Sequence, residues 1–342
     1  MEADLIPGLP ADIALECLLR LPFHALAGAR CVCKRWRQKI TSPSFYGLRK
    51  AGGHARPLIA LIQWNPSGGP GYKNLNLFEP IAGVWTRLAA VPDCSNYCQV
   101  AAVGHELVVI DGGRPPTGTV HVYNLLTGVR RRGATIPGPR RTAFAFAASA
   151  EARMAYVAGG KNEHGESLRS ALAYDVAADA WVRLPDMALS RKECRGIFVN
   201  GAFCVAGGQE MYHWTSEVFD VAAGRWTAKH GMILEESLIN PFMGAAAAAA
   251  ESRLYRCGGK VEVDVCSGNG GEGVGGWRRL RVVPEKLSWL PAHVAAENGG
   301  VMVLGTSLAR RIPCILEEGK WRQVVIPTEF AGLVRSLCAF QL

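Results

Sequence analysis

The glycine-rich segment Gly268–Gly273 formally has the G-x-G-x-x-G spacing of a dinucleotide-binding loop. In such a site a helix follows the loop and binds the pyrophosphate, and an acidic residue about 20 positions further on binds the ribose. Here Trp277 and a strand-like sequence follow instead. We therefore interpret residues 267–276 as an inserted loop that does not bind nucleotides.

Other residues that could support catalysis are scattered along the sequence. It contains no Walker lysine, no His-Glu-x-x-His and no G-x-S-x-G pattern, and its eight histidines are spread from His24 to His293. Cys31 and Cys33 are one residue apart but have no second Cys or His pair nearby to complete a zinc site, so we expect them to be core cysteines. The sequence predicts a protein that is not an enzyme and holds no metal or cofactor.

The composition indicates an ordered chain with a diffuse positive charge. Of 342 residues, 49% are hydrophobic, and 38 basic against 29 acidic side chains give a net charge of +9. The charge is spread along the chain, with local clusters at Arg130–Arg132 and at Arg140-Arg141. This distribution favours a solvated basic surface over a nucleic-acid-binding element, in which basic and aromatic side chains would concentrate.

The cysteines and the N-terminus indicate a reducing compartment. No run of 18 uncharged apolar residues predicts a membrane span, and the acidic start Met1–Asp4 lacks the basic region of a signal peptide. Most of the eleven cysteines lie in apolar runs, where a reduced thiol behaves as a small hydrophobic group. We expect the protein in the cytoplasm, the nucleus or both, without membrane contact.

Residues 9–50 have the pattern of several short helices. Pro10 suits the first turn of a helix, and the apolar residues that follow it extend to Pro22. A second apolar stretch comes after Pro22. A unit of about 40 residues cannot bury apolar side chains on two faces by itself, so one face should meet a partner. The unit is expected to be a small all-α domain over residues 1–50.

Three anchors in this unit, Leu9-Pro10, Leu21-Pro22 and Val32–Trp36, resemble the F-box in order and spacing. The resemblance implies binding to the Skp adaptor, and through it to a cullin, in an SCF-type ubiquitin ligase. A generic helical cap on the second domain is the alternative. The residues expected to form or support the adaptor surface are Leu9, Pro10, Ile13, Leu21, Pro22, Val32 and Trp36.

The rest of the chain, residues 51–342, contains an internal repeat. Apolar runs end in Gly112-Gly113, Gly159-Gly160, Gly207-Gly208 and Gly258-Gly259, with the second glycines 47, 48 and 51 residues apart. A tryptophan follows most pairs, and in the first four units an aromatic residue lies seven positions before it, with Arg130 in the tryptophan's place in the second unit; the fifth and sixth units depart from this interval. The pattern predicts six units of four short strands each. For the third unit we expect strands over 141–148, 154–159, 171–176 and 181–184.

This pattern is similar to the Kelch repeat, which implies an all-β propeller of six blades. The repeat register predicts that Ala245–Ala250 is a strand despite its helix propensity. Unit one lacks its innermost strand, and Val334–Phe340 matches one, so we predict that this last segment closes the ring beside Leu58–Leu61.

The Tyr174-Asp175-Val176 segment leading to Trp181, and the junction Lys50–His54, are similar to the plant Kelch F-box group. That resemblance implies a substrate-recognition subunit whose target is a phenylpropanoid enzyme such as phenylalanine ammonia-lyase, or a type-B response regulator of cytokinin signalling. A Kelch scaffold without ubiquitination is the alternative, and an enzymatic or sugar-binding propeller is a third possibility.

The target is expected on one face of the propeller. Loops from second to third strands, and from fourth strands to the next unit, lie on one face because strand directions alternate. Arginine forks bind carboxylates and aromatic residues dominate binding hot spots, which would make this face a basic, aromatic-rimmed pocket for an acidic target segment; solvated loop charge is the alternative. The residues that the pattern places there are Arg114, Arg140, Arg141, Lys161, Arg169, Arg191, Lys192, Arg195, Tyr212, His213 and Trp214.

Overall fold

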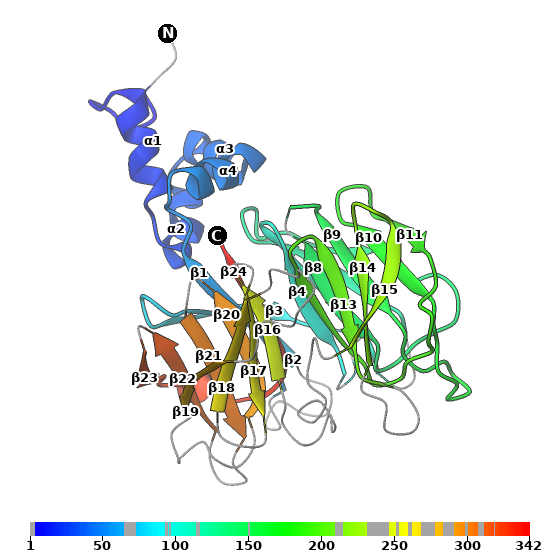
Figure 1. Cartoon of the computed structure of the whole chain (residues 1–342). Coiled ribbons are helices and arrows are strands. Elements are labelled where there is room, and N and C mark those ends of the chain that lie inside the picture. The colour runs from blue at the N-terminus through cyan, green and yellow to red at the C-terminus, as the bar shows by residue number, and fades with distance from the viewer. Residues whose placement is uncertain are drawn as a thin grey trace.

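The computed structural model places four helices at the N-terminus and β-sheets in the rest of the chain (Figure 1). It describes residues 4–342 except 65–72, 93–94, 96, 114–116, 150, 209–214, 231–245, 251–252, 259–261, 268–277, 283–290, 298–299, 307–310 and 318. The glycine-rich segment 268–273 therefore lies outside the described residues.

Prolines and a cysteine set the starts of the four helices. They are α1 (Ala11–Leu19), α2 (Phe23–Val32), α3 (Lys34–Thr41) and α4 (Pro43–Ala51). Pro10 and Pro22 are the N-cap residues of α1 and α2, and Pro43 begins α4, where its missing N–H costs no helical hydrogen bond. Cys33 caps α3, because its Sγ accepts a hydrogen bond from the Trp36 N–H at 3.4 Å.

The expectation that Cys31 and Cys33 are core cysteines is wrong. Both side chains are exposed, and so is Cys17 on α1. The apolar cysteines of the sheets follow the expectation, since Cys194, Cys204 and Cys314 are buried. Burial raises the pKa of the Cys204 thiol to about 12, so this thiol stays protonated and unreactive at neutral pH.

The described residues form six four-stranded sheets in which all neighbouring strands are antiparallel. In the first sheet, β24 lies beside β1, followed by β2 and β3; each later sheet takes four consecutive strands. The strands of the first two sheets are β24 (Leu333–Gln341), β1 (Pro57–Trp64), β2 (Lys73–Glu79), β3 (Val84–Ala90), β4 (Gln99–Val103), β5 (Glu106–Ile110), β6 (Val120–Asn124) and β7 (Arg130–Gly133).

The third and fourth sheets repeat this arrangement with β8 (Ala145–Ser149), β9 (Met154–Ala158), β10 (Ala171–Asp175), β11 (Ala180–Leu184), β12 (Arg195–Val199), β13 (Ala202–Ala206), β14 (Thr215–Asp220) and β15 (Arg225–His230). The fifth and sixth contain β16 (Ala246–Ala250), β17 (Arg253–Gly258), β18 (Glu262–Ser267), β19 (Arg278–Val282), β20 (Pro291–Glu297), β21 (Gly300–Thr306), β22 (Arg311–Glu317) and β23 (Lys320–Gln323). The alanine run is thus a strand, as the repeat register predicts.

The first strand of the third unit begins later than predicted. Residues 141–144 precede β8, and the β-bridge that they form is an isolated one, Thr142 to Lys161. The reason is Ala143, whose φ of 51° turns the chain out of the extended conformation just before the strand. The other three strands of this unit lie within one residue of their predicted bounds.

The repeated tryptophans connect adjacent sheets. The indole N–H of Trp181 donates to the Ala134 carbonyl at 2.8 Å, and that of Trp226 donates to the Pro185 carbonyl at 2.7 Å. Each acceptor directly follows the outermost strand of the preceding sheet. Arg130, which replaces a tryptophan in the second unit, makes the equivalent contact with the Ala90 carbonyl at the end of β3.

The glycine pair of the third unit is required by close backbone approach. Gly159 and Gly160 have φ of 65° and 98°, and a Cβ on Gly160 would lie 2.7 Å from the Thr142 carbonyl oxygen. A Cβ on Gly159 would lie 2.8 Å from the Arg191 carbonyl oxygen. Any larger residue would push apart the loops that lead into two successive first strands.

The last strand pairs with the first one along its length. In the β24–β1 ladder Phe340 lies opposite Leu58 and Leu337 opposite Leu61, which confirms the predicted pairing. The first strands of successive sheets also contact one another in the order β4, β8, β12, β16 and β20, and both β20 and β4 contact β24.

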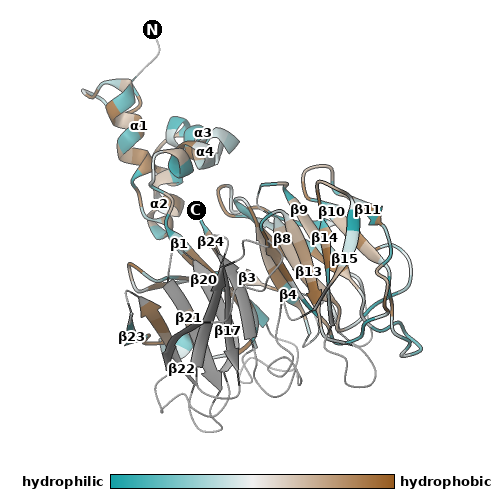
Figure 2. Ribbon diagram, in the orientation of Figure 1, coloured by the Kyte–Doolittle hydropathy of each residue, from teal (hydrophilic) through white to brown (hydrophobic). Residues whose placement is uncertain are grey.

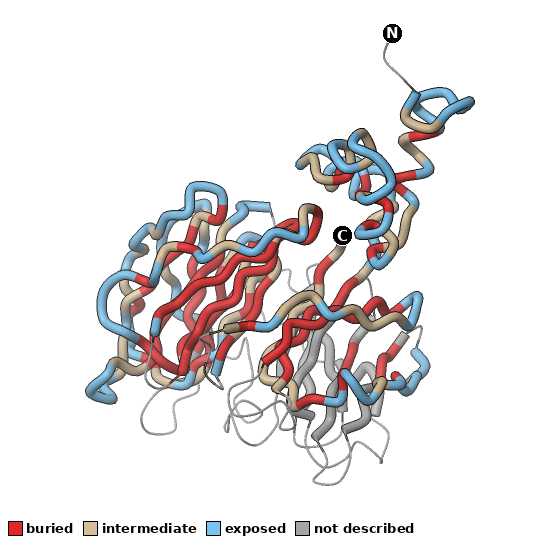
Figure 3. Tube along the Cα trace, turned by 180° about the vertical axis from the view of Figure 1, so that it is seen from behind, coloured by how far each residue is buried: buried red, intermediate tan, exposed pale blue. Residues whose placement is uncertain are grey.

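Burial follows this arrangement. The described strands near the sheet centres are apolar and buried, whereas the connecting turns and most of the helical surface are exposed (Figures 2 and 3). None of the helices in the described part of the chain is long and apolar enough to cross a bilayer.

Candidate adaptor-binding and target-binding surfaces

The helical unit (α1–α4) keeps part of its apolar surface exposed. Leu18 and Phe23 are buried, but Leu9, Ile13 and Val32 are 36%, 48% and 63% exposed. Leu9 lies directly before Pro10, the N-cap of α1, and Ile13 lies in the first turn of α1, so both exposed side chains belong to the start of this helix. An exposed apolar surface on a small helical unit indicates a binding site for another protein.

The other predicted adaptor residues differ in their exposure. Pro10 is exposed, and Leu21, Pro22 and Trp36 are half-buried. The Trp36 indole N–H donates to the Leu5 carbonyl at 2.8 Å, which fastens the segment before α1 to α3. The sequence-predicted residues thus divide into exposed apolar groups and half-buried groups that can support them.

The helical unit is docked on one end of the first two sheets. Its buried side chains Leu26 and Phe45 belong to the same hydrophobic cluster as Leu58 in β1 and Leu107 in β5. The strand turns at this end are β2–β3, β4–β5 and β6–β7. Figure 1 shows the helices at this end, together with the C-terminus.

Polar contacts fix the same docking. Glu79 accepts hydrogen bonds from the backbone N–H of His24, at 2.9 Å, and lies 3.0 Å from its Nδ1. Arg30 donates to the Leu126 carbonyl in the β6–β7 turn. The Tyr46 ring packs on His105 in the β4–β5 turn, with centroids 5.5 Å apart.

The loops predicted to bind a target lie at the opposite end of the sheets. They include the β9–β10 loop and the β11–β12 loop, which follow strands running away from the helical unit. We call this end the loop face. Arg114, Tyr212, His213 and Trp214 lie outside the described residues.

Two of the predicted target-binding arginines are buried and support the loop face from within. Arg141 is 2% exposed and donates to the Gly159 and Ser170 carbonyls at 3.2 and 3.1 Å. Arg191 is fully buried and donates to the Gly207 carbonyl at 2.9 Å. Gly159 and Gly207 are the first glycines of their pairs, so Arg141 and Arg191 make the same contact in two successive units.

Arg191 also forms a buried ion pair with Glu217 of β14. The Arg191 Nε lies 3.2 Å from Glu217 Oε1, and the two side chains are 0% and 2% exposed. The Glu217 carboxylate accepts further hydrogen bonds from the Ala188 and Leu189 N–H groups at 2.7 and 3.3 Å. This network holds the β11–β12 loop in shape and leaves neither charge available to a partner.

Other predicted residues are engaged in surface ion pairs. Lys161 pairs with Glu193, and Arg169 lies 3.4 Å from Asp186. Because acidic groups accompany these cations, the described part of the loop face has mixed charge. A uniformly basic pocket is therefore not what the described residues form.

The loop face presents charged groups of both signs and apolar groups to solvent, and its exposed carboxylates include Glu163 and Glu193. Arg140 and Arg195 are exposed cations, and Lys192 is half-buried. Tyr97 and Leu189 are exposed apolar groups, at 55% and 41%, which the sequence alone did not single out. Like Arg140 and Lys192, both residues lie in segments that lead into the first strand of a sheet, and this shared position could have indicated them.

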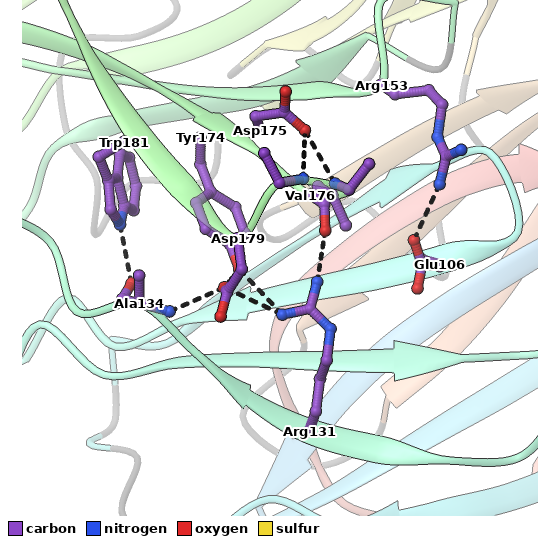
Figure 4. A network of polar contacts seen from close by, with 11 residues as sticks. Glu106, Arg131, Ala134, Arg153, Tyr174, Asp175, Val176, Asp179 and Trp181 are labelled. Carbon is purple, nitrogen blue, oxygen red and sulfur yellow. Dashed lines mark hydrogen bonds and ion pairs between the residues drawn. The ribbon is translucent and has the colours of Figure 1, made fainter.

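A polar network ties the second sheet to the third (Figure 4). Arg131 of β7 lies 3.0 Å from Asp179, whose carboxylate also accepts hydrogen bonds from the Tyr174 hydroxyl and the Ala134 N–H. Burial opposes ionisation of Asp179, but the hydrogen bonds from Tyr174 and Ala134 and the Arg131 charge outweigh it and lower the pKa of Asp179. Burial, followed by the hydrogen bond to Asp179, raises the pKa of Tyr174 to about 12.

No metal-binding group of three or more His, Cys, Asp or Glu side chains occurs in the described ranges. The arrangement there consists of two surfaces, one apolar and helical, the other a set of loops with mixed polarity, at opposite ends of a β-structure. Such an arrangement suits a protein that joins two partners.

Comparison with known proteins defines the class. Residues 6–47 match the F-box domain, and residues 154–188, which cover β9 to β11, match the Kelch motif. The protein thus combines an F-box with Kelch-type four-stranded sheets.

Several relatives share this combination along most of their length. The chain is 33% identical over 330 residues to the Arabidopsis thaliana F-box/kelch-repeat protein At1g80440, covering 90% of this chain and 89% of that protein. It is 36% identical to At1g15670 (74% and 77% covered) and 29% identical to F-box/kelch-repeat protein SKIP20 (73% and 72% covered), both from the same plant. The chain belongs to the F-box/kelch-repeat protein family.

Proposed function

We propose that this protein is the substrate-recognition subunit of an SCF-type ubiquitin ligase and has no catalytic role itself. The observation that carries the proposal is the helical unit, an F-box with Leu9, Ile13 and Val32 exposed, docked at the end of the sheets away from the loop face. The F-box binds the Skp adaptor and through it a cullin, and the loop face binds the target.

The six sheets are proposed to form the six blades of a closed Kelch propeller over residues 51–342, following an F-box domain over residues 1–50. Supporting this are the β24–β1 pairing and the contacts between first strands, which run from β4 through β20 to β24 and back to β4. In a closed ring every blade packs its faces between two neighbours, and only the short outermost strands keep an open edge.

The target is proposed to be a protein segment that carries both acidic and apolar side chains. Arg140 and Arg195 offer exposed charges on the loop face, while Tyr97 and Leu189 offer exposed apolar surface. Apolar anchors beside arginine are the usual composition of binding hot spots. A phenylpropanoid enzyme such as phenylalanine ammonia-lyase, or a type-B response regulator, is proposed as the target in the cytoplasm or nucleus.

The adaptor assignment is tested by the double substitution Leu9→Ala with Pro10→Ala. Each large apolar side chain that a partner buries contributes about 1.5–3 kcal/mol, so adaptor affinity should fall tenfold or more, since about 1.4 kcal/mol corresponds to tenfold. Calorimetric titration of the full chain with purified Skp adaptor measures this change.

Val182→Ala is the control, because Val182 is an apolar residue that is 52% exposed but lies on β11, outside the helical unit. It should leave the affinity unchanged. Undiminished adaptor binding by the double variant would contradict the assignment, and an equal loss with Val182→Ala would show a non-specific effect.

A further inference from the structure

Arg49 of α4 is fully buried and uses both of its terminal nitrogens to bind backbone carbonyls. Its Nη1 donates to Leu19 and Leu21 at 2.6 and 2.7 Å. Its Nη2 donates to His54 and Leu342 at 3.3 and 3.2 Å. One guanidinium therefore holds four acceptors from separate parts of the chain.

These acceptors belong to parts that must be joined for the helical unit to have a fixed orientation. Leu19 and Leu21 lie at the end of α1, His54 lies in the junction before β1, and Leu342 directly follows β24. Leu342 and Arg56 also exchange two backbone hydrogen bonds, which fasten the end of β24 to the start of β1. Arg49 thus connects the first helix to the start of β1 and the end of β24, two neighbouring strands of the first sheet.

The chemistry of Arg49 suits orientation rather than simple charge pairing. No ion pair to a carboxylate is found for it in the described residues, and burial lowers its pKa to about 10, so it remains charged at neutral pH. The planar guanidinium directs its donors at fixed angles, whereas a lysine ammonium is a compact group on a flexible stem. A lysine at this position would keep the charge but could not hold two pairs of carbonyls in the same way.

A second tie restricts rotation about Arg49. Glu16 of α1 lies 2.9 Å from His54 Nε2 in the same junction. Further away, Glu79 of β2 binds the start of α2 through His24. Together with the Arg30 and Tyr46 contacts to the second sheet, these attachment points define an orientation, whereas one point alone would allow the unit to pivot.

We propose that Arg49 is a positioning residue that fixes the orientation of the F-box on the first sheet. A target on the loop face is thereby held at a constant place relative to the adaptor, and only lysines in that region of space receive ubiquitin. The second part of this inference rests on the proposed ligase function, and the first part does not.

The orientation is measured directly by pulsed electron paramagnetic resonance on the full chain bound to Skp adaptor. Spin labels are carried on unnatural amino acids at Gln38 of α3 and Ala180 of β11, both exposed, so that the native cysteines need no replacement. The unaltered chain should give one narrow distance distribution. Arg49→Met and Arg49→Lys should both broaden or shift it, whereas Lys50→Met, which removes an exposed charge next to Arg49, should not.

Folding and ligase function are separated from orientation by two further readouts. Circular dichroism shows whether each variant folds; if Arg49→Met does not fold, Arg49→Lys decides the test. In a reconstituted reaction with cullin, RING subunit, conjugating enzyme and ubiquitin, the lysines modified on the chain itself should spread to new positions in the folded Arg49 variant.

Distances unchanged in a folded Arg49 variant would overturn the positioning role. A changed distance with unaltered lysine usage would overturn the link to ubiquitin placement. Absence of any ubiquitin transfer by the unaltered chain, with the distance change still present, would count against the ligase proposal alone.

Discussion

Glu217→Gln tests whether the loop face depends on a buried charge. The Glu217 carboxylate receives three hydrogen bonds, from Arg191 Nε and from the Ala188 and Leu189 N–H groups. A neutral amide replaces one acceptor oxygen by an NH₂ group that faces donors. It also removes the carboxylate charge that lies 3.2 Å from Nε of the fully buried Arg191 side chain.

The magnitude follows from this burial. Removing one member of a buried ion pair costs about 3–5 kcal/mol, because the remaining charge stays uncompensated away from water. The unfolding entropy of about 2.1 cal/mol/K per residue gives about 0.7 kcal/mol/K for 342 residues, so about 1 kcal/mol corresponds to about 1.4 °C and the variant should melt about 4–7 °C lower. Amide hydrogen exchange in the β11–β12 loop should rise at the same time, since the carboxylate binds its backbone.

Thermal unfolding followed by circular dichroism measures the effect, with Arg169→Gln as the control. Arg169 forms an ion pair with Asp186 on the same face, but its side chain is 62% exposed, so its loss should cost less than about 1 kcal/mol. If Glu217→Gln melted as high as Arg169→Gln, the buried pair would not support the loop face, and the reasoning would be refuted.

Three further outcomes are expected. The pKa of Asp179 is lower in the folded state than its unfolded value near 3.8. The ionised carboxylate therefore stabilises the fold above pH 3.8, and this stabilisation disappears as the pH falls through the lower folded pKa. The difference in melting temperature between the unaltered chain and Asp179→Asn should accordingly shrink below about pH 4. Truncation after Thr328 removes β24 and exposes β1, so the product should be insoluble or should melt at a lower temperature; an equally stable truncate would contradict closure by β24. Arg140→Glu should reduce the capture of target proteins from plant extract while adaptor binding persists, and Arg132→Glu on β7 should leave capture intact; equal losses would mean that charge acts non-specifically.

The choice of Arg140 alone follows from the structure. Reversing Arg140 and Arg141 together would confuse target binding with folding, because Arg141 is buried and binds Gly159. Arg153 is a poor control at the other end of the sheets, since it lies 3.4 Å from Glu106 and a glutamate there would repel it.

The repeat made the strands and the outer tryptophans predictable. Each unit requires a glycine pair and a tryptophan at fixed positions of its backbone, so the units appear in the sequence as a regular repeat. The pairing of β24 with β1 was predictable for the same reason, because the repeat register leaves one unit without its innermost strand.

Which arginines are buried could not be predicted from residue type. Arg140 and Arg141 are neighbours in the sequence, yet one is exposed and the other binds Gly159 from within. Comparison of successive units could have distinguished them, since Arg141 and Arg191 occupy equivalent places before β8 and β12.

The docking of the helical unit was also beyond the sequence. Arg49 contacts Leu342, 293 positions away, and His24 contacts Glu79, and no local pattern encodes such pairs. Likewise, the exposure of Cys31 and Cys33 depends on where α2 ends and α3 begins, and a shift of one residue turns a side chain by about 100° around the helix.

The most direct test of the proposed function is to measure whether the proteins that the loop face captures become modified with ubiquitin. The full chain and its Leu9→Ala, Pro10→Ala variant are expressed in plant cells under proteasome inhibition, and captured proteins are quantified together with their ubiquitin-modified peptides. We expect the same proteins with both chains, but ubiquitin enrichment only with the unaltered one. Equal capture without any ubiquitin difference would contradict a substrate receptor and would indicate a Kelch scaffold.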